Sequence, residues 1–165
     1  MDSKRIATPG IVVREGGEAD EAMALAVSRA AFDTLRDVYR PTPKALERQA
    51  ARTAHWKRVV AVADGRVAGT ALFGVRGRRL VVFGLAVDPG RRGRGVGRAI
   101  LAWLADRAAT RRLRAVALNT IRESGNVPYF EKRGFRVLRE VQADWCVSDV
   151  HPRLHDVAME AETPR

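Results

Sequence analysis

The amino-acid sequence predicts an α/β fold, in which helices flank a mixed and mostly antiparallel β-sheet. The first observation is a run of three β-rich segments with only tight turns between them, which is typical of an antiparallel meander. These segments are residues 58–63, 67–75 and 79–87, with turns at Asp64-Gly65 and Arg76-Gly77. The second observation is a helix at about 97–109 that separates the third segment from a strand at 114–119. A helical crossover joins parallel strands, so we expect one parallel pair in the sheet.

One strand and two helices are expected before the meander. Ile11 to Arg14 is predicted to form the strand. Apolar residues spaced three or four apart predict a helix that begins near Glu18 and ends at Arg40-Pro41-Thr42-Pro43. Its expected buried face comprises Met23, Val27, Ala30, Ala31, Leu35 and Val38. A second helix, at about 44–54, is expected to bury Leu46, Ala50 and Ala54.

The remaining elements follow from similar signals. The helix at 97–109 is expected to bury Ile100, Leu101, Leu104, Ala105 and Ala108. Asn126 is expected to cap a short helix that Gly134 ends, and strands are predicted at 135–141 and 154–159. Gly69 and Gly74 stand inside a strand and predict bulges or close packing. The whole chain, 1–165, is expected to be one domain with mobile ends at 1–10 and 161–165.

Composition favours a globular protein in a reducing compartment. Of the 165 residues, 46% are hydrophobic and 30% are charged, which is enough apolar material for a core. No apolar run approaches the ~18 residues that span a bilayer, and the polar N-terminus lacks the apolar stretch of a secretory signal. The single cysteine, Cys146, cannot form an internal disulfide, so a cytoplasmic location is expected. The three histidines show no zinc-ligand spacing, and no metal is expected.

The formal net charge of +11 is compatible with an anionic ligand, an acidic membrane or nucleic acid. The arginines are spread along the sequence instead of forming one block, and their excess over lysine can reflect genome composition. Aromatic residues make up only 6% of the chain, and most stand at core-like positions. A nucleic-acid-binding module, which interleaves clustered cations with exposed aromatic rings, is therefore the least favoured class.

The segment from Asp88 to Arg98 is the most informative for function. Its glycines, at positions 93, 95 and 97, allow a ligand to approach the backbone closely. The segment opens into a helix N-terminus, where free N–H groups and the helix dipole favour an anion. Four arginines add cations: Arg91, Arg92, Arg94 and Arg98. The segment predicts an ordered phosphate-binding loop, and a solvated Gly-Arg loop is the alternative. The segment lacks the Lys-Ser/Thr of a P-loop and the glycine spacing of a dinucleotide fold, so neither of these two sites is expected.

Two motifs resemble the GNAT superfamily of N-acetyltransferases. Arg92-Gly93-Arg94-Gly95-Val96-Gly97 is similar to the Arg/Gln-x-x-Gly-x-Gly/Ala signature of that family. The segment from Asn126 to Phe135 is similar to its later Asn-led helix, which ends in Tyr/Phe-Glu-Lys-x-Gly-Phe. The specific resemblance extends from about Arg58 to Phe135 and implies the GNAT fold, whose sheet is splayed at its parallel strand pair to admit acetyl-CoA as the cosubstrate.

The resemblance also implies which residues bind the coenzyme. In the family, the loop amides hold the pyrophosphate, and the end of the preceding strand supplies an N–H group for the tetrahedral oxyanion. Asn126 and Lys132 match positions that contact the pantetheine arm or the phosphates. The implied coenzyme-binding residues are Leu85, Ala86, Val87, Arg92, Gly93, Arg94, Gly95, Val96, Gly97, Arg98, Asn119, Asn126, Phe130 and Lys132.

The acid and the base of the reaction are less well defined by the resemblance. Many family members use a tyrosine directly before the Glu-Lys pair to protonate the departing thiolate. Here Phe130 has that place, and Tyr129 stands one residue, or about 100° of helix, earlier. Tyr129 is the candidate acid, with a packing role as the alternative, and no carboxylate lies between Leu80 and Ala86 to act as the base. Weaker candidates near the acceptor, expected at the surface, are Asp33, Asp37, Tyr39, His151 and His155.

The motifs and composition together predict an N-acetyltransferase that moves an acetyl group from acetyl-CoA to a primary amine. The amine acceptor, a small molecule or a protein, is left open, as is homodimer formation. No membrane or nucleic-acid partner is expected. The alternatives are a non-catalytic acyl-CoA-binding or regulatory domain of the same fold and a basic nucleic-acid-binding module.

Overall fold

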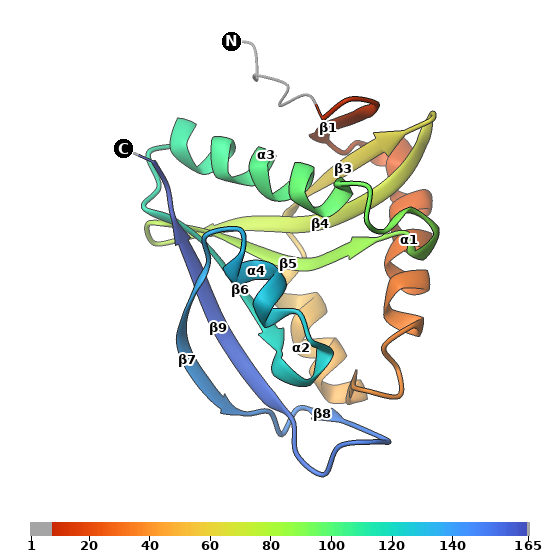
Figure 1. The fold of residues 1–165 in the computed structure, drawn as a ribbon, viewed down its shortest axis with the longest axis vertical. Helices are drawn as coiled ribbons and strands as arrows, with labels where there is room; N and C mark the ends of the chain where they lie inside the picture. Colours follow the sequence, from red (N-terminus) through yellow and green to blue (C-terminus); the bar gives the residue numbers. More distant parts are fainter. Residues whose placement is uncertain (1–7, 165) are drawn as a thin grey trace.

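A seven-stranded sheet, in the order β1-β3-β4-β5-β6-β9-β7, organises the structure (Figure 1). The computed structural model describes residues 8–164; residues 1–7 and 165, which we expected to belong to mobile ends, lie outside this range. Within the described sheet, β5 and β6 are parallel and every other neighbouring pair is antiparallel. The predicted α/β class, with one parallel pair in a mostly antiparallel sheet, is confirmed.

The strands of this sheet lie close to their predicted positions. They are β1 (Ile11–Glu15), β3 (Lys57–Ala63), β4 (Arg66–Arg76), β5 (Arg79–Val87), β6 (Ala115–Ile121), β7 (Arg136–Gln142) and β9 (His155–Glu162). Strand β9 continues past the predicted end, so Ala161 and Glu162, which we assigned to a mobile tail, pair with β6. A separate two-stranded sheet, β2 (Arg40–Pro41) with β8 (Cys146–Val147), was not predicted.

Helices cover both faces of the sheet. They are α1 (Glu21–Asp33), α2 (Pro43–Thr53), α3 (Val96–Thr110) and the short α4 (Val127–Glu131), with 3₁₀ turns η1 (Glu18–Asp20), η2 (Pro89–Arg91) and η3 (Arg122–Ser124). In β3, Val59 and Ala61 join the core cluster with α3, whereas Val60 between them joins the cluster with α1. Because successive strand residues point to opposite faces, α3 and α1 lie on opposite sides of the sheet.

Helix α3 packs as its sequence predicts, across β1, β3, β4, β5 and β6 (Figure 1). Four of the five residues expected on its inner face are fully buried, and the fifth, Ala105, is partly buried against the same core. Trp103 adds an edge-on contact with Phe73 of β4, with ring centroids 5.5 Å apart. This single core extends over the parallel strand pair and includes Leu80 and Val116.

Helix α1 buries part of its predicted face, Val27 and Ala31, whereas helix α2 buries a different face from the one predicted. Helix α1 ends at Asp33 and packs on β4 and β5 through Ala24, Val27 and Ala31. The larger Met23 remains exposed, because only a stripe of small residues lets the helix approach the strands closely. Helix α2 buries Ala45, and the expected face of Leu46, Ala50 and Ala54 is exposed to solvent.

The two glycines inside β4 are explained by close packing, as predicted. A Cβ atom at Gly69 would lie 2.6 Å from Val96 Cγ1 of α3 and 3.2 Å from the Ala86 carbonyl oxygen. A Cβ atom at Gly74 would lie 2.7 Å from the indole of Trp56. The register of β3 against β4 also shifts next to Gly69. Glycine at 69 thus allows the first turn of α3 to rest directly on the sheet.

We expect Gly69→Ala to lower the free energy of unfolding by about 1–3 kcal/mol, because the new methyl group overpacks the contact between β4 and α3. Urea denaturation measures this loss. The matched control is Gly17→Ala, where the nearest atom to an added Cβ is the Asp20 carboxylate oxygen at 3.9 Å, and its effect should stay within about 0.5 kcal/mol. Equal stability of the two variants would contradict the packing described here.

Candidate functional site

The parallel strands β5 and β6 pair over three residues only. The pairs are Arg79 with Ala115, Leu80 with Val116 and Val81 with Ala117. Beyond them β5 stays with β4 and β6 stays with β9, and Figure 1 shows the two strands diverging. A bulge in β5 accompanies the divergence: Gly84 and Leu85 lie opposite the single residue Ala71, and Gly84 has a φ of +68°. Within residues 8–164, no strand pairs with the β6-facing edge of β5 after Val81.

The loop after β5 presents backbone amides beside this open edge. The Asp88 carboxylate accepts a hydrogen bond from Gly90 N–H at 3.0 Å and fixes the η2 turn. Gly93 and Gly95 then adopt φ angles of +76° and +84°, a left-handed conformation that favours glycine. Gly95 is the N-cap of α3 and has no side chain with which to cap the first helical N–H groups. These amides and the helix dipole therefore face outward as a site for an anion.

The four loop arginines divide into two pairs. Arg91 forms an ion pair with Asp64 at 3.2 Å, and Arg92 donates to the Thr34 hydroxyl at the end of α1 at 3.1 Å. Both side chains thus hold the loop against neighbouring elements. The side chains of Arg94 and Arg98 are exposed and make no hydrogen bond or ion pair with any other described residue. Of the four loop arginines, these two remain available to an anion.

Gly97 is needed for packing within the protein itself. A Cβ atom there would overlap the Tyr129 hydroxyl, which reaches the first turn of α3 from α4, and would lie 3.6 Å from Val87 Cγ2. The Arg133 guanidinium lies 3.4 Å above the Tyr129 ring centroid and donates to the Tyr129 carbonyl oxygen. Burial raises the pKa of the Tyr129 phenol, and the nearby Arg133 charge opposes this only in part. The phenol is therefore protonated near neutral pH.

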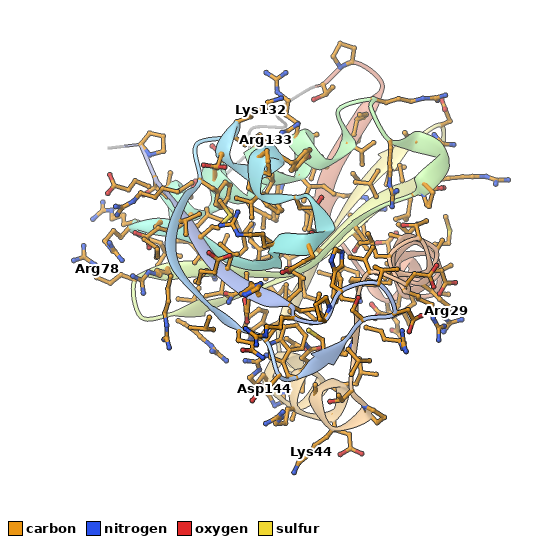
Figure 2. All side chains as sticks on the ribbon, turned by 60° about the horizontal axis from the view of Figure 1, so that its bottom comes forward. Arg29, Lys44, Arg78, Lys132, Arg133 and Asp144 are labelled. Carbon is orange, nitrogen blue, oxygen red and sulfur yellow. The ribbon has the colours of Figure 1, made fainter. Side chains whose placement is uncertain are left out.

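The other predicted residues of α4 and β6 point in different directions. Phe130 is buried in the core, edge-on to Phe135 with centroids 5.7 Å apart, so its ring is not part of the open edge. Asn126 makes no side-chain cap, and that prediction was wrong: the Ser124 hydroxyl accepts its N–H instead, at 3.4 Å. Lys132 is exposed at the end of α4 (Figure 2). Asn119 donates to the Asp156 carboxylate on β9 at 2.8 Å.

At the strand end, Leu85 and Val87 pack partly buried against the main core, and Ala86 is buried against α1. Their side chains are thus anchored in the protein on both faces of the sheet, while their backbone forms the open edge of β5. The structure therefore brings together the strand end at 85–87, the loop at 92–98 and Tyr129. The remaining predicted ligands lie on the surrounding surface or in the core.

A second region, which sequence reasoning missed, fastens the α1–α2 connection to the segment around β8. Thr42 N–H donates to the Trp145 carbonyl at 3.0 Å, and Asp149 N–H donates to the Asp37 carbonyl at 2.9 Å. Arg40 also forms an ion pair with Asp149 at 2.9 Å. A hollow of about 290 Å³ opens beside it, lined by residues 142–144, 146–148 and 151–154. The contacts join residues about 100 positions apart, and no local pattern signals them.

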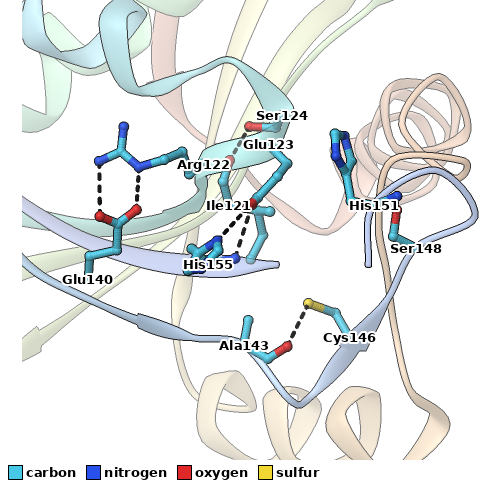
Figure 3. A network of polar contacts seen from close by, with 10 residues as sticks. All are labelled: Ile121, Arg122, Glu123, Ser124, Glu140, Ala143, Cys146, Ser148, His151 and His155. Carbon is cyan, nitrogen blue, oxygen red and sulfur yellow. Dashed lines mark hydrogen bonds and ion pairs between the residues drawn. The ribbon is translucent and has the colours of Figure 1, made fainter. Parts of the chain in front are cut away.

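Polar groups near this hollow are mutually satisfied (Figure 3). The Glu123 carboxylate accepts a hydrogen bond from His155 N–H at 3.0 Å and lies 2.5 Å from His155 Nδ1.

Cys146 is buried in β8, and burial, followed by nearby carboxylates, raises the pKa of its thiol to about 11. The thiol is therefore no nucleophile at neutral pH. The exposed His151 is held through its backbone N–H, which donates to the Ser148 hydroxyl.

Comparison with known sequences identifies the family. The family model described as the acetyltransferase (GNAT) family matches residues 25–135. The chain belongs to the GNAT acetyltransferase family. The motif resemblance noted in the sequence is thereby confirmed, and membership indicates acetyl transfer in general. A comparison with curated proteins found no match.

Solved GNAT structures share the fold over nearly the whole chain. The ribosomal-protein-S18-alanine N-acetyltransferase from Escherichia coli is 17% identical with a TM-score of 0.71, covering 94% of this chain and 95% of that one. The ribosomal-protein-alanine N-acetyltransferase from Brucella melitensis is 20% identical with a TM-score of 0.69, covering 91% and 98%. An N-acetyltransferase from Staphylococcus aureus Mu50 is 19% identical with a TM-score of 0.72, covering 94% and 100%. At these identities the likeness shows the fold alone.

Among residues 8–164, no group of three or more His, Cys, Asp or Glu side chains is arranged to hold a metal ion. No helix in this range is both long and apolar enough to cross a membrane.

The pair formed by Glu123 and His155 predicts a pH-dependent contribution to stability. Burial raises the pKa of Glu123, but the hydrogen bonds from the His155 side chain and backbone outweigh it, and the net pKa lies below its ordinary value of 4.5. The lowered pKa stabilises the folded state above pH 4.5, and this contribution is lost as the pH falls through the native pKa. We expect Glu123→Gln to cost about 1–2 kcal/mol in urea denaturation at pH 7 and close to nothing at the acid end of the range.

The matched control for this measurement is Glu47→Gln, an exposed residue of α2. Its effect should stay within about 0.5 kcal/mol at both pH values. A Glu123→Gln penalty that does not change with pH would contradict the assigned charge state of Glu123.

Proposed function

We propose that this GNAT protein transfers an acetyl group from acetyl-CoA to a primary amine. The observation that carries the proposal is the uncapped N-terminus of α3, with its left-handed Gly93 and Gly95, placed next to the unpaired edge of β5. An anion-binding helix end beside an open backbone edge suits a ligand that is phosphorylated at one end and carries a carbonyl group at the other. Acetyl-CoA has both features.

The chain offers a specific set of groups to the coenzyme. The loop amides from Gly93 to Gly97 and the exposed Arg94 and Arg98 would hold the pyrophosphate. Asn126 and Lys132, exposed on α4, are available to the phosphates or the pantetheine arm. The pantetheine arm would run along the free edge of β5, where it can pair with backbone groups as a strand would.

The transfer step needs three things from the protein. The attacking amine must be neutral, the oxyanion needs an N–H donor, and the thiolate must leave. Residues 85–87 lie at the bulged strand end and would supply the backbone N–H donor. Tyr129 is the proposed proton donor to the sulfur, because Phe130 is buried in the core and the phenol of Tyr129 is protonated.

Coenzyme affinity tests the assigned phosphate site. The double variant Arg94→Gln/Arg98→Gln should weaken coenzyme A binding by about tenfold or more in calorimetry, because two charge-assisted contacts are lost while no internal contact is broken. The control Arg29→Gln/Arg48→Gln removes the same charge from exposed positions on α1 and α2 and should change the affinity less than about twofold. Equal losses in both double variants would contradict a specific phosphate site.

Turnover distinguishes the proposal from a non-catalytic coenzyme-binding domain of the same fold. The core position of Phe130 and the absence of any carboxylate between Leu80 and Ala86 favour that second candidate. An acceptor screen that follows thiol release from acetyl-CoA, with small amines, amino acids and peptides bearing free N-termini or lysines, decides between them. Amine-dependent thiol release supports transfer, and tight coenzyme binding with no release on any amine supports the second candidate.

Replacement of the tyrosine tests its chemical role. If Tyr129 protonates the thiolate, Tyr129→Phe should lower kcat by roughly 10²-fold and leave coenzyme affinity within about threefold, because the ring and its packing are kept. A loss in kcat smaller than threefold would reduce Tyr129 to a packing residue. The complementary Phe130→Tyr change is expected to cost about 1–3 kcal/mol of stability, because it buries a hydroxyl group in the core.

A further inference from the structure

We propose that the end of the sheet opposite the phosphate-binding loop binds the phosphodiester backbone of a nucleic acid. The surface, called the arginine patch below, consists of Arg78, Arg79, Arg111, Arg112, Arg114 and Arg136. Two glutamates, Glu160 and Glu162, are its acidic neighbours. Six arginines against two glutamates leave four positive charges uncompensated, out of the net +11 of the chain. The proposal does not depend on the acetyl transfer proposed above.

Folding gathers the arginine patch from three segments. Arg78 and Arg79 lie at the β4–β5 turn and the start of β5. The α3–β6 connection supplies Arg111, Arg112 and Arg114, and Arg136 begins β7. Arg114 N–H donates to the Arg78 carbonyl oxygen at 2.7 Å, which joins the first two segments. Arg136 is paired in register with Glu160 of β9, which brings in the third. The arginines that are dispersed in the sequence thus form one cluster, and their dispersal no longer argues against a polyanionic partner.

Glu160 holds three of these arginines in place. Its side chain is 1% exposed and accepts hydrogen bonds from Arg79 Nε at 3.0 Å and Arg136 Nη2 at 3.2 Å, with Arg114 Nη2 at 3.5 Å. The three guanidinium side chains are nevertheless 42–63% exposed. One carboxylate can neutralise only one of three cations, so their outward N–H groups remain available. Because the arginines are already oriented, they lose little side-chain entropy when an anion binds.

Arg112 provides an independent sign that a cation is useful at this end. Its φ of +55° is in the left-handed region, where glycine or asparagine is preferred and a long side chain is strained. The residue follows the end of α3, and its N–H donates to the Ala109 carbonyl oxygen at 2.9 Å. The favourable interaction of a cation with a helix C-terminus is sufficient to account for Arg111 without a ligand. It does not account for Arg78 in the β4–β5 turn or for Arg79 at the start of β5.

The coenzyme cannot explain the arginine patch. Arg79 and Val87 are the first and last residues of β5, and a nine-residue strand spans about 27–30 Å, so the patch and the phosphate-binding loop lie at opposite ends. Figure 2 shows Arg78 at one extremity of the molecule, far from Arg29 at the other.

The composition of the arginine patch favours a nucleic acid over an acidic protein. Specific protein interfaces have an apolar, well-packed centre. Among the chain neighbours of these arginines, Gly77 has no side chain and Leu113 is half-buried. Val137, beside Arg136, is 40% exposed, but one aliphatic side chain at the margin of the patch is no packed apolar centre. A phosphodiester backbone binds through charge alone, and without an exposed aromatic ring to stack on bases the contact is independent of sequence.

The test measures binding of a fluorescently labelled 16-base-pair RNA duplex to the full chain by anisotropy, at several salt concentrations and with coenzyme A present or absent. The variant is Arg78→Gln/Arg112→Gly, in which glycine relieves the strained backbone and should keep the melting temperature at or above that of the wild type. The control is Arg29→Gln/Arg48→Gln. We expect the patch variant to bind the duplex with tenfold or more lower affinity, and the magnitude of the slope of log K against log salt to fall by about two. The affinity of the control should fall less than twofold.

Each outcome of this experiment either supports the nucleic-acid proposal or overturns it. Patch-dependent binding that persists with saturating coenzyme A supports the proposal. Equal losses in the patch and control variants would reduce the binding to non-specific charge and overturn it. Displacement of the duplex by coenzyme A would locate the binding in the phosphate loop instead. Patch-dependent binding of a poly-glutamate peptide, with no binding of the duplex, would assign the surface to an acidic protein.

Discussion

The divergence of β5 and β6 after three paired residues is the constraint on which the rest of the structure depends. A parallel pair that continued to the strand ends would bury its backbone groups in the sheet and leave no edge for a ligand. The bulge at Gly84 and Leu85 changes the register against β4 and accompanies this divergence. The polar edge of β5 is thereby exposed next to the N-terminus of α3, so the divergence leaves the two halves of the proposed coenzyme site beside each other.

Helix α4 packs beside the divergent strands, and its two aromatic residues have different contacts. Phe130 and Val127 of this short helix join the main core, and Phe130 packs edge-on against Phe135. Tyr129 is then directed to the first turn of α3, where only a glycine at position 97 leaves room for its hydroxyl. Phe130, which has the place where many family members have a tyrosine, thus fills the core, and Tyr129 contacts α3. The glycine that the family signature reserves for a ligand serves here as a packing partner as well.

The sequence predicts the parts of the fold that depend on local periodicity. Strand β5 has its predicted bounds, and the buried face of α3 was predicted correctly. In both elements a long apolar pattern packs against one buried core, so the pattern alone identifies the buried residues. The buried face of α1 was predicted only in part, through Val27 and Ala31, and that of α2 was wrong. Both helices bury small residues, Ala24 and Ala45, that carry little hydrophobic signal. The β2–β8 pair and the contact between Glu123 and His155 depend on distant segments, and no spacing in the sequence could reveal them.

Charge shows the same limit in another form. The count of +11 and the two motifs predict an anion-binding loop, and the structure adds that Arg91 and Arg92 are already engaged by Asp64 and Thr34. Half of the loop's apparent positive charge therefore serves to hold the loop in place. At the other end of β5 the opposite happens: Glu160, one acidic residue in an otherwise apolar strand segment, organises three arginines from separate segments of the chain. The function of a cation in this protein thus depends on the carboxylate that folding places beside it, and neither net charge nor motif can supply that information.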